Sequence, residues 1–382
     1  MRFTDEKYVC KKVKQIASFG LGLTYTPNYV IEGVPFISSK NISQDFLDLS
    51  DINYISLDEY RRISNNCKPQ RGDILFTRVG SNLGHPVIFD TDENLAIFVS
   101  LGYLRVKSNI NNEFVKHWMN SQSFWNQVKT KIAGSSKMNL NVGWLENFDI
   151  HLPTLNSQKK IASFLNLIEN RIITQKKIIS NLKSLIISIK NTEFYNTKGF
   201  KEKLENILIE INEKTIINDQ HEVLSSTVKG IFKQSDYFDR AVASENNIGY
   251  KIVKRGNIVV SPQNLWMGNI SYNDKFDIGI VSPSYKIFNI SSNYNERYIF
   301  EMLTTKKSLY LFKTVSEQGA SVVRRNLNYE AFMQLTFNIP SLNEQNNFIE
   351  KLSLLQNKLS LENKILSLLE QQKQYLLDKL FI

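Results

Sequence analysis

The sequence predicts an α+β protein built from two tandem modules, each followed by a long helix, with the two helices pairing antiparallel. Two observations predict this fold class. The stretch LPTLNSQ from Leu152 recurs as IPSLNEQ from Ile339. Each copy is followed by a long run in which apolar residues recur with helical spacing. A repeat this far apart indicates duplication of a whole folding unit, because solenoid repeats are much shorter.

The repeat also sets the expected domain boundaries. A shift of 187 residues carries Pro153 onto Pro340, and the match continues without a gap to Phe194 and Phe381. Upstream, RGDILF recurs more loosely as RGNIVV, and NLN occurs in both halves. The predicted division is residues 1–153 for the first module, 154–196 for the first helix, 197–340 for the second module and 341–382 for the second helix.

Each predicted helix carries an apolar seam with alternating spacings of four and three, the heptad pattern of a coiled coil. The seam of the first helix is Ile161, Leu165, Ile168, Ile172, Ile179, Leu182, Ile186 and Ile189, and that of the second is Phe348, Leu352, Leu355, Leu359, Leu366, Leu369, Leu376 and Leu380. We expect the first helix to run from Asn156, a suitable capping residue, to Phe194. A seam of four heptads is too long for one module to cover, which favours pairing of the helices over separate packing of each.

Polar residues interrupt the two seams at equivalent positions. Gln175 and Glu362 would meet in the central layer of the pair and fix its register. Parallel pairing would also bring them level, but antiparallel pairing places the modules at opposite ends of the rod. A second apolar set on the second helix consists of Leu354, Leu361, Ile365 and Leu368. Two interpretations of that set remain open, namely docking of other subunits and packing against the modules.

Each module is predicted to contain a small antiparallel sheet with helices. Each also contains two loops rich in glycine, amides and basic residues. Such side chains read base edges and hold phosphates. The candidate DNA-binding residues are Arg78, Ser81, Asn82, His85, Lys137 and Asn139 in the first module, and Gln263, Asn264, Trp266, Arg324, Arg325 and Asn326 in the second. A solvated surface role is the alternative for each residue taken singly. The loops recur at equivalent places with different sequences. This is typical of one scaffold used twice to recognise two different DNA sequences.

Composition limits the function classes. The net charge of +10 is compatible with a polyanionic partner, and residues 154–196 carry seven basic and two acidic residues. The two cysteines, Cys10 and Cys67, suit neither a disulfide framework nor a metal site. We expect no signal peptide, no membrane span and a cytoplasmic location. No metal is expected.

No catalytic motif is recognisable in the sequence. The stretch FGLGLT at Phe19 superficially resembles a loop that binds S-adenosylmethionine, but it lacks the second half of the methyltransferase signature, and a turn is the favoured interpretation. Phosphate-binding loops, metal-binding histidine pairs and nuclease-like carboxylate clusters are absent as well. The sequence thus predicts a protein without catalysis of its own.

The doubled junction with Pro, Leu, Asn and Gln, each followed by a heptad helix, resembles the specificity subunit of type I restriction-modification systems over essentially the whole chain. The family's usual Glu before Gln is present as Glu344 but replaced by Ser157 in the first copy. The resemblance implies two target recognition domains that read the halves of a split DNA target, held apart by an antiparallel helix pair. It implies methyltransferase subunits that bind S-adenosylmethionine and methylate adenine, and for restriction a motor and nuclease subunit.

The resemblance also makes His85 and Trp266 base contacts or wedges, although a buried tryptophan fits Trp266 equally well. Two other classes compete with it. A coiled-coil adaptor would bind no DNA and only scaffold other proteins, whereas a lone methyltransferase would bind S-adenosylmethionine unaided. The target sequence is not encoded in residue identities alone, because docking geometry decides which base a side chain meets.

Overall fold

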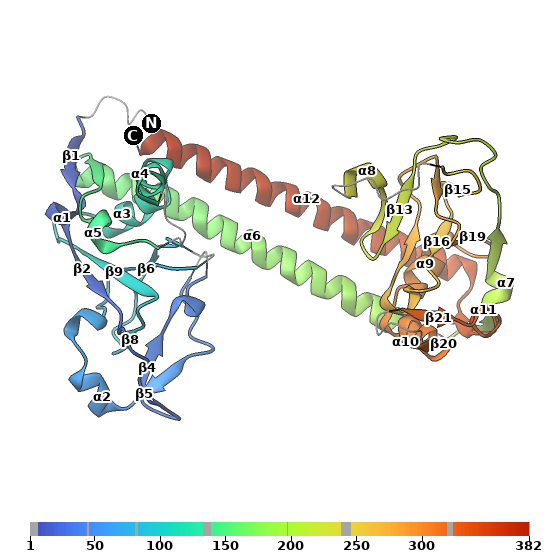
Figure 1. Cartoon of the computed structure of the whole chain (residues 1–382), viewed down its shortest axis with the longest axis horizontal. Coiled ribbons are helices and arrows are strands. Elements are labelled where there is room, and N and C mark those ends of the chain that lie inside the picture. Colours follow the sequence, from blue (N-terminus) through green and yellow to red (C-terminus); the bar gives the residue numbers. More distant parts are fainter. Residues whose placement is uncertain are drawn as a thin grey trace. The chain divides into compact units, whose positions relative to one another are not determined.

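The computed structural model describes residues 7–43, 46–80, 83–132, 139–196, 198–237, 246–318 and 324–381 (Figure 1). The chain forms two compact units, of which unit 1 contains residues 1–178 and 362–382 and unit 2 contains residues 179–361. The boundary between the units therefore falls inside both long helices, and each unit holds one module together with a segment of each helix.

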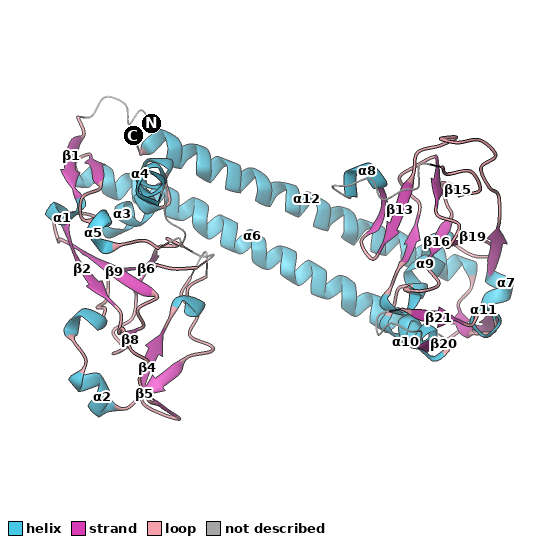
Figure 2. Cartoon of the chain, in the orientation of Figure 1, coloured by secondary structure: helices cyan, strands magenta, loops and turns pink. Residues whose placement is uncertain are grey.

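Unit 1 contains two four-stranded sheets (Figure 2). The first is antiparallel, with the order β2 (Ala17–Leu21), β9 (Leu101–Val106), β6 (Ile74–Thr77) and β7 (Val87–Ile88). The second has the order β3 (Tyr29–Val30), β5 (Asn53–Ile55), β4 (Val34–Ile37) and β8 (Ala96–Ile97), and its β4–β8 pair is parallel. A further antiparallel pair joins β1 (Val9–Lys12) to β10 (Asp149–Leu152). The helices of the module are α1 (Val13–Ile16), α2 (Leu57–Arg62), α3 (Asn112–Met119), α4 (Gln122–Ile132) and α5 (Val142–Leu145).

Unit 2 repeats the main sheet of unit 1 in the same order. Its strands are β12 (Leu208–Ile211), β19 (Lys286–Ile290), β16 (Ile258–Val260) and β17 (Ile270–Tyr272). Antiparallel pairs join β11 (Phe200–Lys203) to β22 (Thr336–Ile339), β13 (Leu224–Thr227) to β14 (Gly230–Lys233), β15 (Lys251–Lys254) to β18 (Ile278–Val281), and β20 (Ser316–Gln318) to β21 (Arg325–Leu327). The helices are α7 (Leu204–Ile207), α8 (Gln234–Tyr237), α9 (Glu296–Leu303), α10 (Lys306–Thr314) and α11 (Tyr329–Met333). The shared strand order agrees with duplication of a whole module.

The two long helices are α6 (Leu155–Asn196) and α12 (Leu342–Leu380), of 42 and 39 residues. The expected capping role of Asn156 is wrong, because α6 already includes this residue. The hydroxyls of Thr154 and Ser341 instead accept hydrogen bonds from the backbone N–H three residues on. Glu344 also accepts a hydrogen bond from the backbone N–H of Ser341, at 2.9 Å, which completes a capping box in the second copy.

The predicted turn at Phe19 is also wrong, because Phe19, Gly20 and Leu21 lie in strand β2 and pair with β9. The glycines serve close packing. A Cβ on Gly20 would lie 2.0 Å from the ring of Tyr103, and one on Gly22 would lie 2.0 Å from the carbonyl oxygen of Phe98.

The two ends of each predicted seam belong to the cores of the units. In unit 1, Ile161 and Leu165 of α6 share a core with Leu377 and Leu380 of α12. In unit 2, Phe194 packs on Phe348 with ring centroids 5.4 Å apart. Coiled-coil packing along the whole of both helices stays a prediction. Within the described residues, no helix is both long and apolar enough to cross a membrane.

Candidate nucleic-acid interface

The structure brings the two candidate loops of the first module side by side. Val79, just after β6, forms a β-bridge with Asn139, and the backbone N–H of Leu140 donates to the carbonyl oxygen of Arg78 at 2.8 Å. Asn139 is exposed and His85 is half-buried. Ser81, Asn82 and Lys137 lie outside the described residues. The two loops therefore form one surface rather than two separate ones.

Arg78 lies at the base of this surface. Its guanidinium donates to the carbonyl oxygens of Val99, at 3.1 Å, and Leu140, at 3.4 Å. Burial lowers the pKa of this side chain. These contacts give Arg78 a part in holding the two loops together.

The candidate loops of the second module also meet. The backbone N–H of Arg325, in β21, donates to the carbonyl oxygen of Gln263 at 3.1 Å. Gln263 and Arg324 are exposed, whereas Asn264 is half-buried and its carbonyl accepts the backbone N–H groups of Met267 and Asn269. Asn326 is exposed and pairs with Glu317 across the β20–β21 hairpin. In both modules, then, the two loops that the sequence singled out adjoin.

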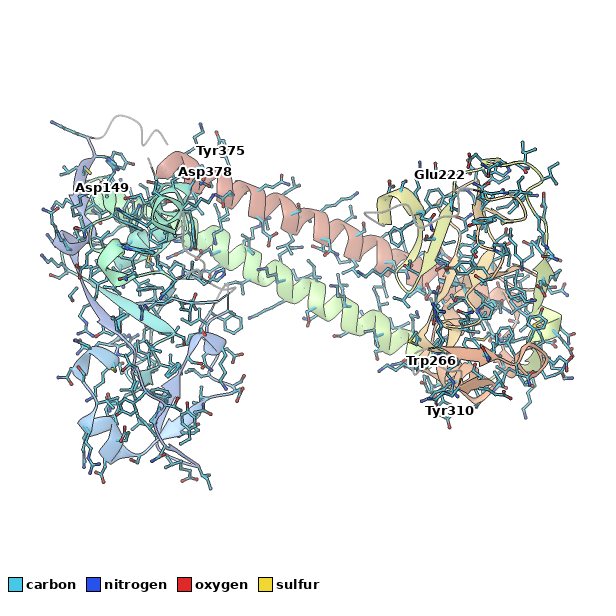
Figure 3. All side chains as sticks on the ribbon, viewed as in Figure 1. Asp149, Glu222, Trp266, Tyr310, Tyr375 and Asp378 are labelled. Atoms are coloured by element: carbon cyan, nitrogen blue, oxygen red, sulfur yellow. The ribbon has the colours of Figure 1, made fainter. Side chains whose placement is uncertain are left out.

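Two basic side chains lie near the ring of Trp266, which is labelled in Figure 3 and belongs to this second surface. The Lys313 ammonium and the Arg325 guanidinium lie 5.8 and 5.9 Å from its ring centroid, within the range of cation–π attraction. Arg325 also donates to the carbonyl oxygen of Ser316 at 2.6 Å. The Trp266 Nε1 and Arg325 Nε atoms are buried and have no hydrogen-bond partner among the described residues. The ring is half-buried, and a role for it as a base contact or wedge stays a prediction.

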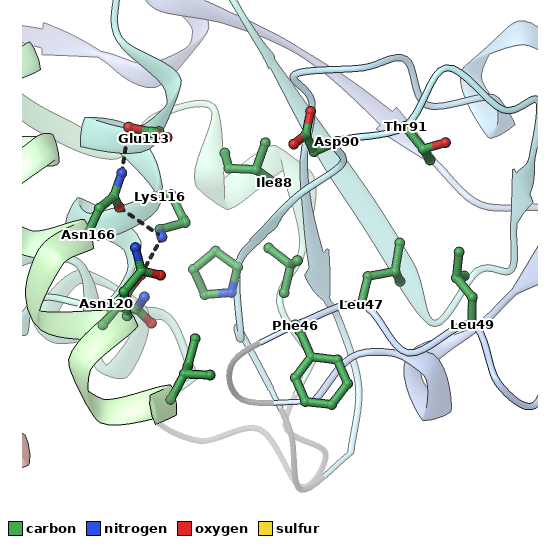
Figure 4. A pocket seen from close by; sticks show the side chains of 15 residues that line it. Phe46, Leu47, Leu49, Ile88, Asp90, Thr91, Glu113, Lys116, Asn120 and Asn166 are labelled. Atoms are coloured by element: carbon green, nitrogen blue, oxygen red, sulfur yellow. Dashed lines mark hydrogen bonds and ion pairs between the residues drawn. The ribbon is translucent and has the colours of Figure 1, made fainter. Parts of the chain in front are cut away.

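A buried polar cluster in unit 1 was not foreseen. The carboxylate of Glu169, on α6, lies 2.6 Å from the ammonium of Lys116 on α3 and 2.7 Å from that of Lys373 on α12. Asn166 donates a hydrogen bond to Glu113 (Figure 4), and its side-chain oxygen lies 2.7 Å from Nε2 of the fully buried His117 ring. One carboxylate thus ties α3 to both long helices.

The ionisation of this cluster follows from its burial and its charges. Burial, helped by the charge of Lys116, lowers the pKa of His117 to about 4, so the ring is neutral at pH 7. Burial alone would raise the pKa of Glu169, but attraction to the neighbouring His117, Lys116 and Lys373 outweighs it and lowers this pKa to about 2. Because His117 is neutral at pH 7, the two ammonium groups hold the carboxylate ionised there.

Unit 2 has a cluster at the corresponding place with a different arrangement of charges. Glu301, on α9, lies 2.5 Å from the ammonium of Lys190 on α6 and 3.6 Å from the guanidinium of Arg297. Gln356, on α12, donates to Glu301 at 3.3 Å. Sequence spacing within one element could not have revealed either cluster, since each draws on three helices far apart in the chain.

Gln175 and Glu362, the predicted central pair, meet within unit 1. The Gln175 side-chain amide donates to the Glu362 carboxylate at 2.5 Å and to its carbonyl oxygen at 3.0 Å. Together with Glu169 and Lys373, this contact shows that the two helix segments of unit 1 run in opposite directions. A role for the pair in fixing register stays a prediction. The exposed set of Leu354, Leu361, Ile365 and Leu368 is found on the surface of α12.

Beside the cluster of unit 1 lies an open pocket of about 550 Å³ (Figure 4). Its walls combine Leu47, Ile88 and Ile173 with Lys116 and Glu169. None of the described candidate loop residues lines it. Across the described residues, no group of three or more His, Cys, Asp or Glu side chains is placed to hold a metal ion.

The fold, two similar modules that each pack on segments of two long helices, defines a class of two-module proteins with solved members. A crystal structure of the type I restriction-modification system S subunit from M. genitalium has a TM-score of 0.57 and 13% identity, covering 100% of this chain and 98% of that one. A structure reported for complex assembly and conformational transition of the type I R-M system has a TM-score of 0.62 and 12% identity, covering 99% and 98%. At these identities the similarity shows the fold.

The family model confirms the resemblance drawn from the repeated junction. Residues 8–184 match the type I restriction modification DNA specificity domain. This part of the chain is similar to that family, and the whole chain has the fold of type I restriction-modification S subunits.

Proposed function

We propose that this chain is the DNA-recognition subunit of a type I restriction-modification complex and reads a bipartite target, one half with each module. The observation that carries the proposal is the doubled reading surface. The same sheet order and the same pair of adjoining loops occur in both units, whereas the loop side chains differ. Two such surfaces on one chain are suited to two different short DNA sequences.

In this proposal the exposed loop residues Asn139, Gln263, Arg324 and Asn326 are available for base edges or phosphates, while Arg78 and Arg325 hold the loops in place. Amide and guanidinium groups are the side chains that read purines bidentately in the major groove. The cations around Trp266 add attraction for the phosphate backbone, so DNA binding should weaken as salt is raised.

The chemistry is proposed to come from partners. Methyltransferase subunits would bind S-adenosylmethionine and methylate an adenine in the target, and a motor and nuclease subunit would add cleavage. The exposed leucine and isoleucine side chains on α12 give such partners an apolar surface to dock on. The chain itself would position the partners and supply no reacting group.

The test is methylome sequencing of a host that expresses this chain with its cognate methyltransferase subunit, repeated after residues 1–153 are exchanged for those of another family member. We expect adenine methylation at a split motif, of which only one half changes after the exchange. If an assembled complex produces no new methylation, the chain is better described as an adaptor that scaffolds proteins without reading DNA.

A further inference from the structure

Each module is joined to its long helix by one buried glutamine, and the two joints are nearly identical. Gln158 in the first turn of α6 is 2% exposed, and Gln345 in the first turn of α12 is 1% exposed. They occupy the same position of the repeated junction. A glutamine is rarely buried this deeply unless its side-chain amide is hydrogen-bonded, so both side chains require an explanation.

In unit 1, Gln158 connects three elements. Its Nε2 donates to the carbonyl oxygen of Pro153, the residue after β10, at 2.9 Å. Its Oε1 accepts the backbone N–H of Asn111, the capping residue of α3, at 3.0 Å. Since a carbonyl only accepts and an N–H only donates, the orientation of the amide is fixed.

Unit 2 repeats the joint atom for atom. Gln345 Nε2 donates to the carbonyl oxygen of Pro340 at 2.9 Å, and its Oε1 accepts the backbone N–H of Asn295 at 2.9 Å. Asn295 caps α9 as Asn111 caps α3, each through its side-chain oxygen. Outside this joint the polar surroundings of the two helices differ, so the glutamine is what the two halves share.

The joint resists rotation of the module about its helix. Any change in the angle between α3 and α6 moves Asn111 relative to Pro153 and breaks one or both bonds of the amide. Each broken bond would leave a buried donor or acceptor unpaired, which is costly. Apolar contacts tolerate small rotations. The glutamine therefore fixes the angle between the module and the helix more strictly than apolar contacts would.

We infer that Gln158 and Gln345 are positioning residues that fix the angle of each module to its long helix and thereby the spacing between the two DNA half-sites. This inference rests on the proposed function. The glutamines touch no DNA in this role, so the sequence read in each half-site does not depend on them. What depends on them is how strictly the number of base pairs between the halves is enforced.

The experiment uses the full chain in complex with its cognate methyltransferase subunit and DNA targets that keep both half-sites. The spacer has its natural length or is one base pair shorter or longer. The variants are Gln158→Met and Gln345→Met, which keep volume but remove both bonds, and Gln158→Glu, which keeps the acceptor for Asn111. The exposed Gln372 supplies the matched control, Gln372→Met.

We expect each methionine variant to methylate the natural spacer while its discrimination against the altered spacers falls by roughly fivefold to tenfold, the equivalent of one or two hydrogen bonds. Gln158→Glu should lie between wild type and Gln158→Met, and the control should match wild type. An unchanged ratio between spacers, with methylation lowered equally on all of them, would overturn the inference and leave the glutamines a purely structural role. Failure of the wild-type complex to methylate any split target would instead overturn the proposed function.

If Gln158→Met fails to assemble, Gln345→Met and Gln158→Glu decide the matter by the same ratio. Loss of assembly in all three variants would also overturn the inference, because the glutamines would then act in folding rather than in spacing.

Discussion

The two units each pack a module on the long helices through a cluster of charged side chains, but the charges are arranged differently in the two clusters. In unit 1 the acid is the half-buried Glu169 on the long helix α6, and the module contributes a lysine and a neutral histidine. In unit 2 the buried acid is Glu301 on the module's own helix, and α6 contributes Lys190. His117 and Glu301 occupy equivalent positions, six residues after the capping asparagine, and the repeat aligns Glu169 with Gln356.

The difference shows which features the duplicated module can vary. The backbone joint with its glutamine and capping asparagine is the same in both units, whereas the acid of the charged cluster lies on the long helix in unit 1 and on the module in unit 2. Each helix segment is consequently matched to one partner. Four experiments test this comparison, beginning with the largest expected effect.

Glu169→Ala should have the largest effect. It removes the one carboxylate between Lys116 and Lys373 and leaves two ammonium groups close together and partly buried. We expect a loss of about 3 kcal/mol of local stability. Hydrogen exchange of the α3 amides should accelerate while that of α9 stays unchanged. The control is Gln356→Ala at the equivalent position, where loss of a neutral hydrogen bond should cost about 1 kcal/mol or less. Equal effects of the two variants would contradict the comparison.

Glu301→Gln should follow, with a loss of about 2 kcal/mol confined to unit 2, because Lys190 would lose its carboxylate in a mostly buried setting. The matched change in unit 1 is His117→Gln, which replaces one neutral group by another and should cost about 1 kcal/mol at pH 7. The measurement is protection of α9 and α3 amides from exchange. A larger effect at α3 than at α9 would show that charge is not what distinguishes the clusters.

Acid should weaken unit 1 before unit 2. The folded pKa of His117 is about 4 against an ordinary value of 6.5, so between these values the unfolded chain binds a proton that the folded chain does not. Stability is complete above pH 6.5 and falls by up to about 1.4 kcal/mol per pH unit as the pH drops toward 4. Glu169, with its lowered pKa, adds a further loss below about pH 4.5.

The measurement for this third test is urea unfolding of wild type and His117→Gln at pH 7.5 and pH 5, followed by a probe in unit 1. The variant should lose most of the difference between the two pH values. An unchanged difference would place the titrating group elsewhere.

The smallest effect is expected at the central pair. Replacing Gln175 and Glu362 together by leucine should change the free energy of unfolding by about 1 kcal/mol or less, or raise it slightly, since apolar residues often replace buried polar pairs without loss. If the pair fixes register, the double variant should instead show mixed helix alignments, measured as more than one distance between spin labels on α6 and α12. A single distance would argue against a role in register.

Much of the fold could be predicted because it depends on local patterns. The repeated junction, the seams and the interruptions at Gln175 and Glu362 are all visible at fixed spacing in the sequence. The starts of the helices were predicted less well, since Thr154 and Ser341 compete with the neighbouring asparagines as caps and only backbone geometry decides between them. The turn predicted for FGLGLT was wrong for a similar reason. Its glycines are needed for close packing against Tyr103 and Phe98, and the sequence of the stretch alone does not show these contacts.

The candidate site divides in the same way. The recurrence of the loops identified the candidate residues, but the contacts of the half-buried Arg78 and Arg325 depend on which carbonyls lie opposite them. The clusters around Glu169 and Glu301 left no signal at all, because each combines residues from three separate helices. A sequence pattern can identify residues that contact one another within one helix or strand, but it does not identify contacts between separate elements.

The contribution of α12 to unit 1 has a consequence for how the protein is made. Leu377, Leu380 and Phe381 belong to the core of unit 1, and the ring of Phe381 lies 4.9 Å from that of Phe114. A ribosome synthesises these residues only after all of unit 2. The unit that is translated first is therefore completed last, and until then its unfinished core depends on protection from aggregation during synthesis.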